Sequence, residues 1–235
     1  MRTILPVAGP LANDLDGLEI LVKSVIEARP AMLDPSAIDV PWRDLPIPTN
    51  RKLRLGLLSE DPLYPLHPPV QCALELAVLA LRQNGHEIVP LSADHGHVAD
   101  AAEVAWKLWG LDDRADGIVK ASSEPTVPSR LRIANEAKSM DWHFVPDLSG
   151  MDGLEKLSAL NIKRAEIIAV WNRVWTAQNL DAVIGPSAGH TAVEHDMYGI
   201  PAYTSLLNLL EVSCNEKEPP SIILTNLVSG VCAAL

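Results

Sequence analysis

The stretch Leu53-Arg54-Leu55-Gly56-Leu57-Leu58, together with the residues up to Leu91, decides the fold class. These six residues form a short apolar run, which is typical of a strand. Apolar residues then recur every three or four positions over Val70–Gln83, which predicts a helix that ends at Asn84-Gly85. His86–Leu91 predicts a second strand. A strand–helix–strand order favours parallel pairing of the two strands.

A third strand is predicted at Asp181-Ala182-Val183-Ile184, where Gly185-Pro186 ends it. It follows the longest helical pattern of the chain, Leu154–Leu180, and its apolar residues predict a central, buried position. Further helices are expected at Leu11–Ala28 and Val98–Leu111, with a short one at Arg130–Ser139, whereas Asp112–Pro128 is polar and expected to be a loop. The sequence therefore predicts an α/β fold, a mixed β-sheet with helices on its faces.

Composition narrows the classes of partner. The formal net charge is −11 and no basic stripe occurs, so we expect no nucleic acid as a partner, because phosphate binding needs clustered Lys and Arg. The longest apolar stretches, such as Ala73–Leu81, are too short to span a bilayer, so no membrane is expected. Cys72, Cys214 and Cys232 give no disulfide framework, and the N-terminus does not resemble a signal peptide. These features favour a soluble protein of the cytoplasm.

The densest cluster of ligand-type residues follows the third strand. His190, His195 and Asp196 lie just beyond its carboxyl end, which is where α/β proteins place ligand loops. Three interpretations stay open: the rim of a pocket, a plain surface loop, or two ligands of a divalent metal. Our expectation is a pocket rim without a metal and without a cofactor. Asn208 is a weaker rim candidate, because a cap or turn role also fits it.

Several segments, in the right order, resemble the amidase signature family, especially its fungal acetamidase-like members. The resembling segments are Thr3–Ala12, Pro41-Trp42-Arg43, Lys52–Leu58, His67-Pro68-Pro69-Val70, Asn84–Val89, Gly185–Asp196 and Tyr203–Leu210. The resemblance implies an amide hydrolase that converts a small carboxylic amide to an acid plus ammonia or an amine. It also implies a Ser–Ser–Lys triad, in which a lysine takes the proton that keeps the serine a weak nucleophile.

The residues of that triad cannot be placed in this sequence, so we name no catalytic residue. The family's Gly/Ser-rich nucleophile segment ends shortly before the part that resembles Thr3–Ala12, and no Gly-Gly-Ser cluster occurs here. Ser122-Ser123 is the only Ser-Ser pair, and its Glu124-Pro125 flank offers no glycine-rich donors for an oxyanion. A truncated, inactive chain is therefore our expectation.

The expected organisation is a single incomplete amidase-like domain over residues 1–235. Residues 1–50 form a helix plus a Pro-rich connector, 51–211 form the α/β part, and 212–235 depart from the family as a divergent tail in which Ile222–Leu224 is a strand candidate. The main alternative is a non-catalytic remnant, or a subunit whose partner supplies the catalytic serines. Under this alternative we also consider an association with a secondary-metabolite pathway. That partner is either an N-terminal amidase half or a second copy of the chain.

Overall fold

A computed structural model describes residues 4, 11–35, 37–43, 51–112, 114–210 and 222–223. The chain divides into two units, Leu5–Arg51 and Met1–Ile4 with Lys52–Leu235. The division lies one residue beyond the predicted limit of the Pro-rich connector.

The larger unit is built on a four-stranded parallel sheet. Its strands are β1 (Arg54–Leu58), β2 (Glu87–Leu91), β3 (Ala182–Ile184) and β4 (Ile222–Ile223), in the order β2-β1-β3-β4. Gly56 is paired with Val89 on one side and with Val183 on the other. The predicted parallel pairing of the first two strands is confirmed, and so is the buried third strand. The expected mixed sheet is wrong for the described strands, because all three pairings are parallel. At least one helix separates the two strands of each described pair along the chain, so no tight hairpin turn joins them and parallel pairing is favoured.

Side chains of β1 alternate between two hydrophobic clusters, which places helices on both faces of the sheet. Leu55 packs with Leu74 of α2 (Pro68–Gln83) and with Ile184 of β3. Leu58 belongs to the larger cluster on the other face, together with side chains from α4 (Val98–Trp109), α7 (Gly153–Gln178) and α8 (Ala202–Leu210). The predicted helix between the first two strands is confirmed.

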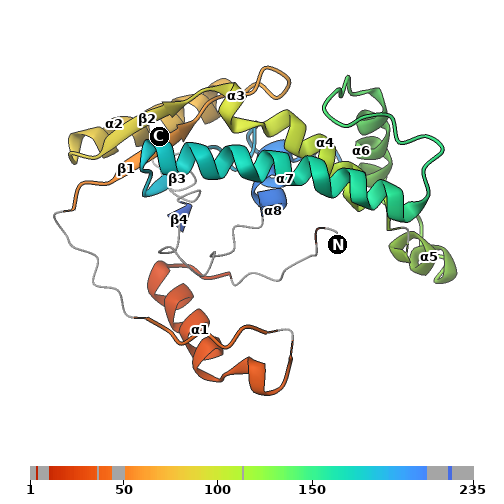
Figure 1. Ribbon diagram of the computed structural model, residues 1–235, viewed down its shortest axis with the longest axis horizontal. Helices are drawn as coiled ribbons and strands as arrows, with labels where there is room; N and C mark the ends of the chain where they lie inside the picture. The colour runs from red at the N-terminus through yellow and green to blue at the C-terminus, as the bar shows by residue number, and fades with distance from the viewer. Residues whose placement is uncertain are drawn as a thin grey trace. The chain divides into compact units, whose positions relative to one another are not determined.

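The helices of the larger unit surround this second cluster (Figure 1). Long helix α7 lies beside α4 and α8, and the strands lie near its carboxyl-terminal end. A capping box at Asp152 and Glu155 fixes the start of α7. Besides α2, the helices are α3 (Ala93–Gly96), α4 (Val98–Trp109), α5 (Arg114–Ala121), α6 (Pro128–Ser139), α7 (Gly153–Gln178) and α8 (Ala202–Leu210).

One segment differs from the prediction, and another had no predicted secondary structure. The expected loop Asp112–Pro128 contains α5, a helix of 8 residues whose only large apolar residues are the adjacent pair Ile118-Val119, too few to show a helical repeat. The segment that begins at Tyr203 forms α8, where Leu206 and Leu209 are fully buried. No helix among the described residues is long and apolar enough to cross a membrane.

Among the described strands, β2 lies at one edge of the sheet, and Pro90 shapes that edge. The amide of Glu87 donates to the Leu53 carbonyl of the neighbouring chain segment, at 2.8 Å. Donors alternate along a strand, so the amides of Val89 and Leu91 also face β1, whereas positions 88 and 90 face outward. Proline has no amide hydrogen to donate, so the outward side of β2 offers a donor only at Ile88.

The smaller unit contains α1 (Leu15–Glu27) and a 3-10 helix, η1 (Pro30–Met32). Asp14 caps α1, because its carboxylate accepts a hydrogen bond from the Gly17 amide at 2.6 Å. Arg29 forms an ion pair with Asp39. The predicted helix over Leu11–Ala28 is confirmed, and Pro30 follows its end as expected.

Candidate functional site

The carboxyl ends of β1, β2 and β3 lie at one edge of the sheet, because these strands are parallel. The segments that follow them, residues 59–67, 92–97 and 185–200, therefore gather at that edge. Direct contacts join them: the amide of His67 donates to the Gly189 carbonyl at 2.7 Å, and the Ser59 hydroxyl donates to the Leu91 carbonyl. This edge is the candidate functional site.

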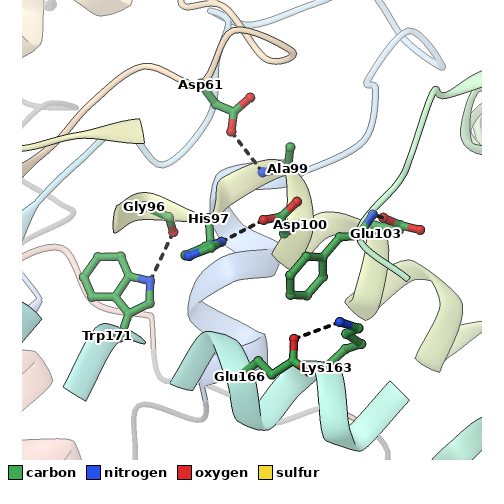
Figure 2. Close-up of polar contacts among 10 residues, drawn as sticks. Asp61, Gly96, His97, Ala99, Asp100, Glu103, Lys163, Glu166 and Trp171 are labelled. Atoms are coloured by element: carbon green, nitrogen blue, oxygen red, sulfur yellow. Dashed lines mark hydrogen bonds and ion pairs between the residues drawn. The ribbon is translucent and has the colours of Figure 1, made fainter. Parts of the chain in front are cut away.

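Asp61, buried at the end of β1, fixes the first of these segments. Its carboxylate accepts hydrogen bonds from the amides of Leu63, at 2.9 Å, and of Ala99 in α4, at 3.1 Å. The carboxylate thus lies at the positive end of the α4 dipole (Figure 2). No local sequence pattern indicates this role, because Ala99 is 38 positions away from Asp61.

The Tyr203 hydroxyl connects α8 to the same segment. It donates to the Tyr64 carbonyl at 2.7 Å and accepts from the amide of Asp61 at 3.2 Å. Burial raises the pKa of the Tyr203 phenol, and burial likewise raises the pKa of the Tyr64 phenol. Both phenols therefore stay protonated through neutral pH, and Tyr203 keeps its donor role.

The segment after β2 leads into α4 through His97, whose backbone is left-handed at φ 52°. The imidazole Nδ1 of His97 lies 2.7 Å from the carboxylate of Asp100, and the Trp171 indole of α7 donates to the Gly96 carbonyl at 3.1 Å (Figure 2). An open pocket of about 300 Å³ lies here. It is lined by Asp61, Pro62, Ala93, Asp94, His97, Ala99 and Asp100.

The segment after β3 carries the histidines singled out in the sequence. The His190 ring lies edge-on to Tyr198, with ring centroids 4.8 Å apart, and 5.9 Å from the ring of His67. Its Nδ1 lies 3.0 Å from the Thr191 carbonyl. The ring neighbours of His190 are thus His67 and Tyr198 rather than His195. Neither neighbour was predicted, because no local pattern links positions 67 and 190.

The other predicted residues lie at the surface. The side chains of His195, Asp196 and Asn208 are exposed, and Asp196 has a left-handed backbone at φ 64°. Within the described ranges, no group of three or more His, Cys, Asp or Glu side chains is arranged to hold a metal ion. The pocket-rim role of these four residues, His190 included, stays a prediction.

Ser122, the one serine weighed as a nucleophile, lies just after α5. Its hydroxyl donates to the carbonyls of Ile118 and Val119, each at 3.0 Å. Such bonding to the preceding helical turn is an ordinary local role for serine.

The parallel α/β core with loops gathered at its carboxyl edge defines the class of protein, and comparison with known proteins gives the family. A family model described as Amidase matches residues 1–216, so the chain belongs to the amidase family. An amidase of Gibberella moniliformis is 29% identical over 210 residues, which are 88% of this chain and 38% of that relative. An acetamidase of Emericella nidulans is 27% identical over 228 residues, 89% of this chain and 38% of the relative. The chain thus spans less than two fifths of the length of these curated relatives.

A solved structure supports the fold. Fatty acid amide hydrolase matches with a TM-score of 0.74 and 24% identity, over 88% of this chain and 35% of that chain. At that identity the likeness establishes the shared fold. It confirms the expected partial amidase-signature α/β fold.

Proposed function

We propose that this chain forms one part of an amide hydrolase for small carboxylic amides, with the amide bond held near the carboxyl edge of its sheet. The observation that carries the proposal is the family match over residues 1–216, which includes all three segments at that edge. In that reaction water cleaves the carbon–nitrogen bond and yields a carboxylic acid plus ammonia or an amine. The acetamidase of Emericella nidulans makes acetamide the first substrate to test.

The nucleophile in this proposal comes from outside the 235 residues. Amide hydrolysis through a serine requires a base next to the hydroxyl and fixed donors for the oxyanion. The sequence has no Gly-Gly-Ser cluster, and the Ser122 hydroxyl already donates to helix carbonyls. A segment that supplies the serines is therefore the proposed partner, whether it belongs to the same polypeptide, to a separate chain or to a second copy. No metal and no cofactor is part of the proposal, and the cytoplasm is its proposed location.

The alternative function is that of a non-catalytic chain. The local engagement of Ser122 favours it for these residues taken alone. Under this alternative the chain binds an amide or a partner without cleaving anything.

A reconstitution experiment separates the two functions. The 235-residue chain is mixed with the part of the Gibberella moniliformis amidase that it does not match, and ammonia release from acetamide is measured. We expect ammonia from the mixture and none from either component alone. A serine-directed fluorophosphonate should label the added segment and leave the chain unlabelled. Stoichiometric labelling of a serine in the isolated chain contradicts the proposal, and association without ammonia release supports the non-catalytic alternative.

A further inference from the structure

Two side chains of helix α6 hold the loop that contains Tyr198. Arg132 and Glu136 are four positions apart, so they lie on the same face of the helix. They form an ion pair with 3.5 Å between the nearest nitrogen and oxygen. Both also reach the main chain of residues 196–200, which lie more than sixty positions further along the sequence.

Arg132 binds this loop at two carbonyls. Its Nε donates to the Asp196 carbonyl at 3.0 Å, and one terminal nitrogen donates to the Tyr198 carbonyl. A guanidinium presents its donors in a rigid planar fork, so two bonds fix both the position and the orientation of the peptide they bind. Asp196 has a left-handed backbone at φ 64°, an unusual conformation for a residue with a side chain. The bond from Arg132 holds the carbonyl of this same residue.

Glu136 binds the same loop at the next alternate residue. Its Oε1 accepts a hydrogen bond from the Ile200 amide at 3.4 Å. Gly199 lies directly against this carboxylate, since a Cβ at that position would be 3.2 Å from Oε1. Positions 196, 198 and 200 are thus all held from α6, two by the cation and one by the anion.

We propose that Arg132 and Glu136 are positioning residues that hold Tyr198 against His190 at the carboxyl edge of the sheet. Tyr198 is 39% exposed, so packing around it does not fix its place, whereas its own carbonyl is bound by Arg132. The ring of Tyr198 lies 4.8 Å from that of His190, so the position of the loop sets the surroundings of the imidazole. The role in shaping a substrate pocket rests on the proposed function, but the positioning of Tyr198 does not.

The test follows the His190 imidazole by NMR in protein labelled at histidine, with the signal assigned by its loss in His190→Gln. Tyr198→Leu defines the signal of a His190 that has lost its ring neighbour. We expect Arg132→Met to move the His190 signal most of the way to that position. Lys138→Met, which removes an exposed cation from the same helix, is the matched control and should leave the signal in place. Chymotrypsin should cut after Tyr198 about five- to thirtyfold faster in Arg132→Met than in the control, because the loop opens locally.

A second pair of variants keeps the proposal testable if Arg132→Met does not fold. Arg132→Lys keeps the charge but loses the planar fork, so we expect an intermediate shift of the His190 signal and intermediate cleavage. Glu136→Gln should shift the signal in the same direction by a smaller amount. A His190 signal unchanged in Arg132→Lys and Glu136→Gln, with cleavage at the rate of Lys138→Met, overturns the proposal. No readout depends on amide hydrolysis, so this failure and a failure of the proposed function remain distinct.

Discussion

The carboxylate of Asp61 caps the N-terminus of α4, although Asp61 lies outside that helix. His97, at the position before α4, has a left-handed backbone, and its side chain accepts no hydrogen bond from the backbone amides of the first turn. Asp61 provides the missing acceptor for the Ala99 amide from across the sheet edge. Such a cap stabilises a helix by about 0.5–2 kcal/mol. It also fixes the loop after β1 at the carboxyl edge of the sheet, where the proposed site lies.

Two neighbouring positions in the sequence should respond very differently to truncation. Ile184→Ala should cost roughly 2–5 kcal/mol, because Ile184 is 1% exposed and packs with Leu55 and Leu74. His190→Ala should barely change the free energy of unfolding, because its ring is half-buried and contacts only other edge residues. Thermal melts of both variants decide the matter. If His190→Ala lowers the melting temperature as much as Ile184→Ala, the loop is structural and the pocket-rim prediction is wrong.

At the scale of elements, the sequence predicted β1, α2, β2 and β3 because the apolar pattern of each lies within its own residues. Leu55 follows the alternating pattern of strand β1, and Leu74 follows the helical spacing of α2. It missed α5, since 8 residues with one adjacent apolar pair are too few to show a helical repeat, and it made no secondary-structure prediction for α8. It could not predict the edge contacts either. The Tyr203 hydroxyl and the Asp61 amide meet across 142 positions, and no periodicity encodes such a pair.

Strand β1 should not accept a larger residue at Gly56. A Cβ there would lie 2.9 Å from Cδ1 of Leu180 and 3.0 Å from Cδ1 of Leu91, both buried. Gly56→Val should therefore destabilise the protein by about 1–3 kcal/mol through overpacking between the sheet and the end of α7. Urea unfolding measures the change. Gly117→Val is the control, because a Cβ at Gly117 would have nothing within 4 Å; equal stabilities of the two variants would refute the packing argument.

For the molecule as a whole, Tyr203 makes stability depend on alkaline pH. Burial raises the pKa of the Tyr203 phenol above its value in the unfolded chain, which is about 10. Below that value both states hold the proton and the stability is fully present. As pH rises further, the unfolded chain releases the proton first, so stability falls through the folded pKa.

Tyr203→Phe should separate this pH effect from the loss of two hydrogen bonds. We expect the variant to be less stable at pH 8 by roughly 1–3 kcal/mol, because the Asp61 amide and the Tyr64 carbonyl lose their partner. Above pH 10 the gap between variant and parent should narrow, since phenylalanine has no proton to lose. Chemical unfolding at a series of pH values checks both statements. A gap that is constant with pH would show that the buried phenol does not contribute to alkaline unfolding.

Pro90 lies in β2, at one edge of the described sheet, and removes a hydrogen-bond donor from that edge. An incoming strand would find one donor, at Ile88, where an open edge of that length offers two. Copies of the chain can polymerise side by side through their sheets only if each copy pairs with a neighbour at both edges of its sheet. Pro90 on the outermost described strand removes one of the two outward donors, so it disfavours polymerisation of copies through the β2 edge.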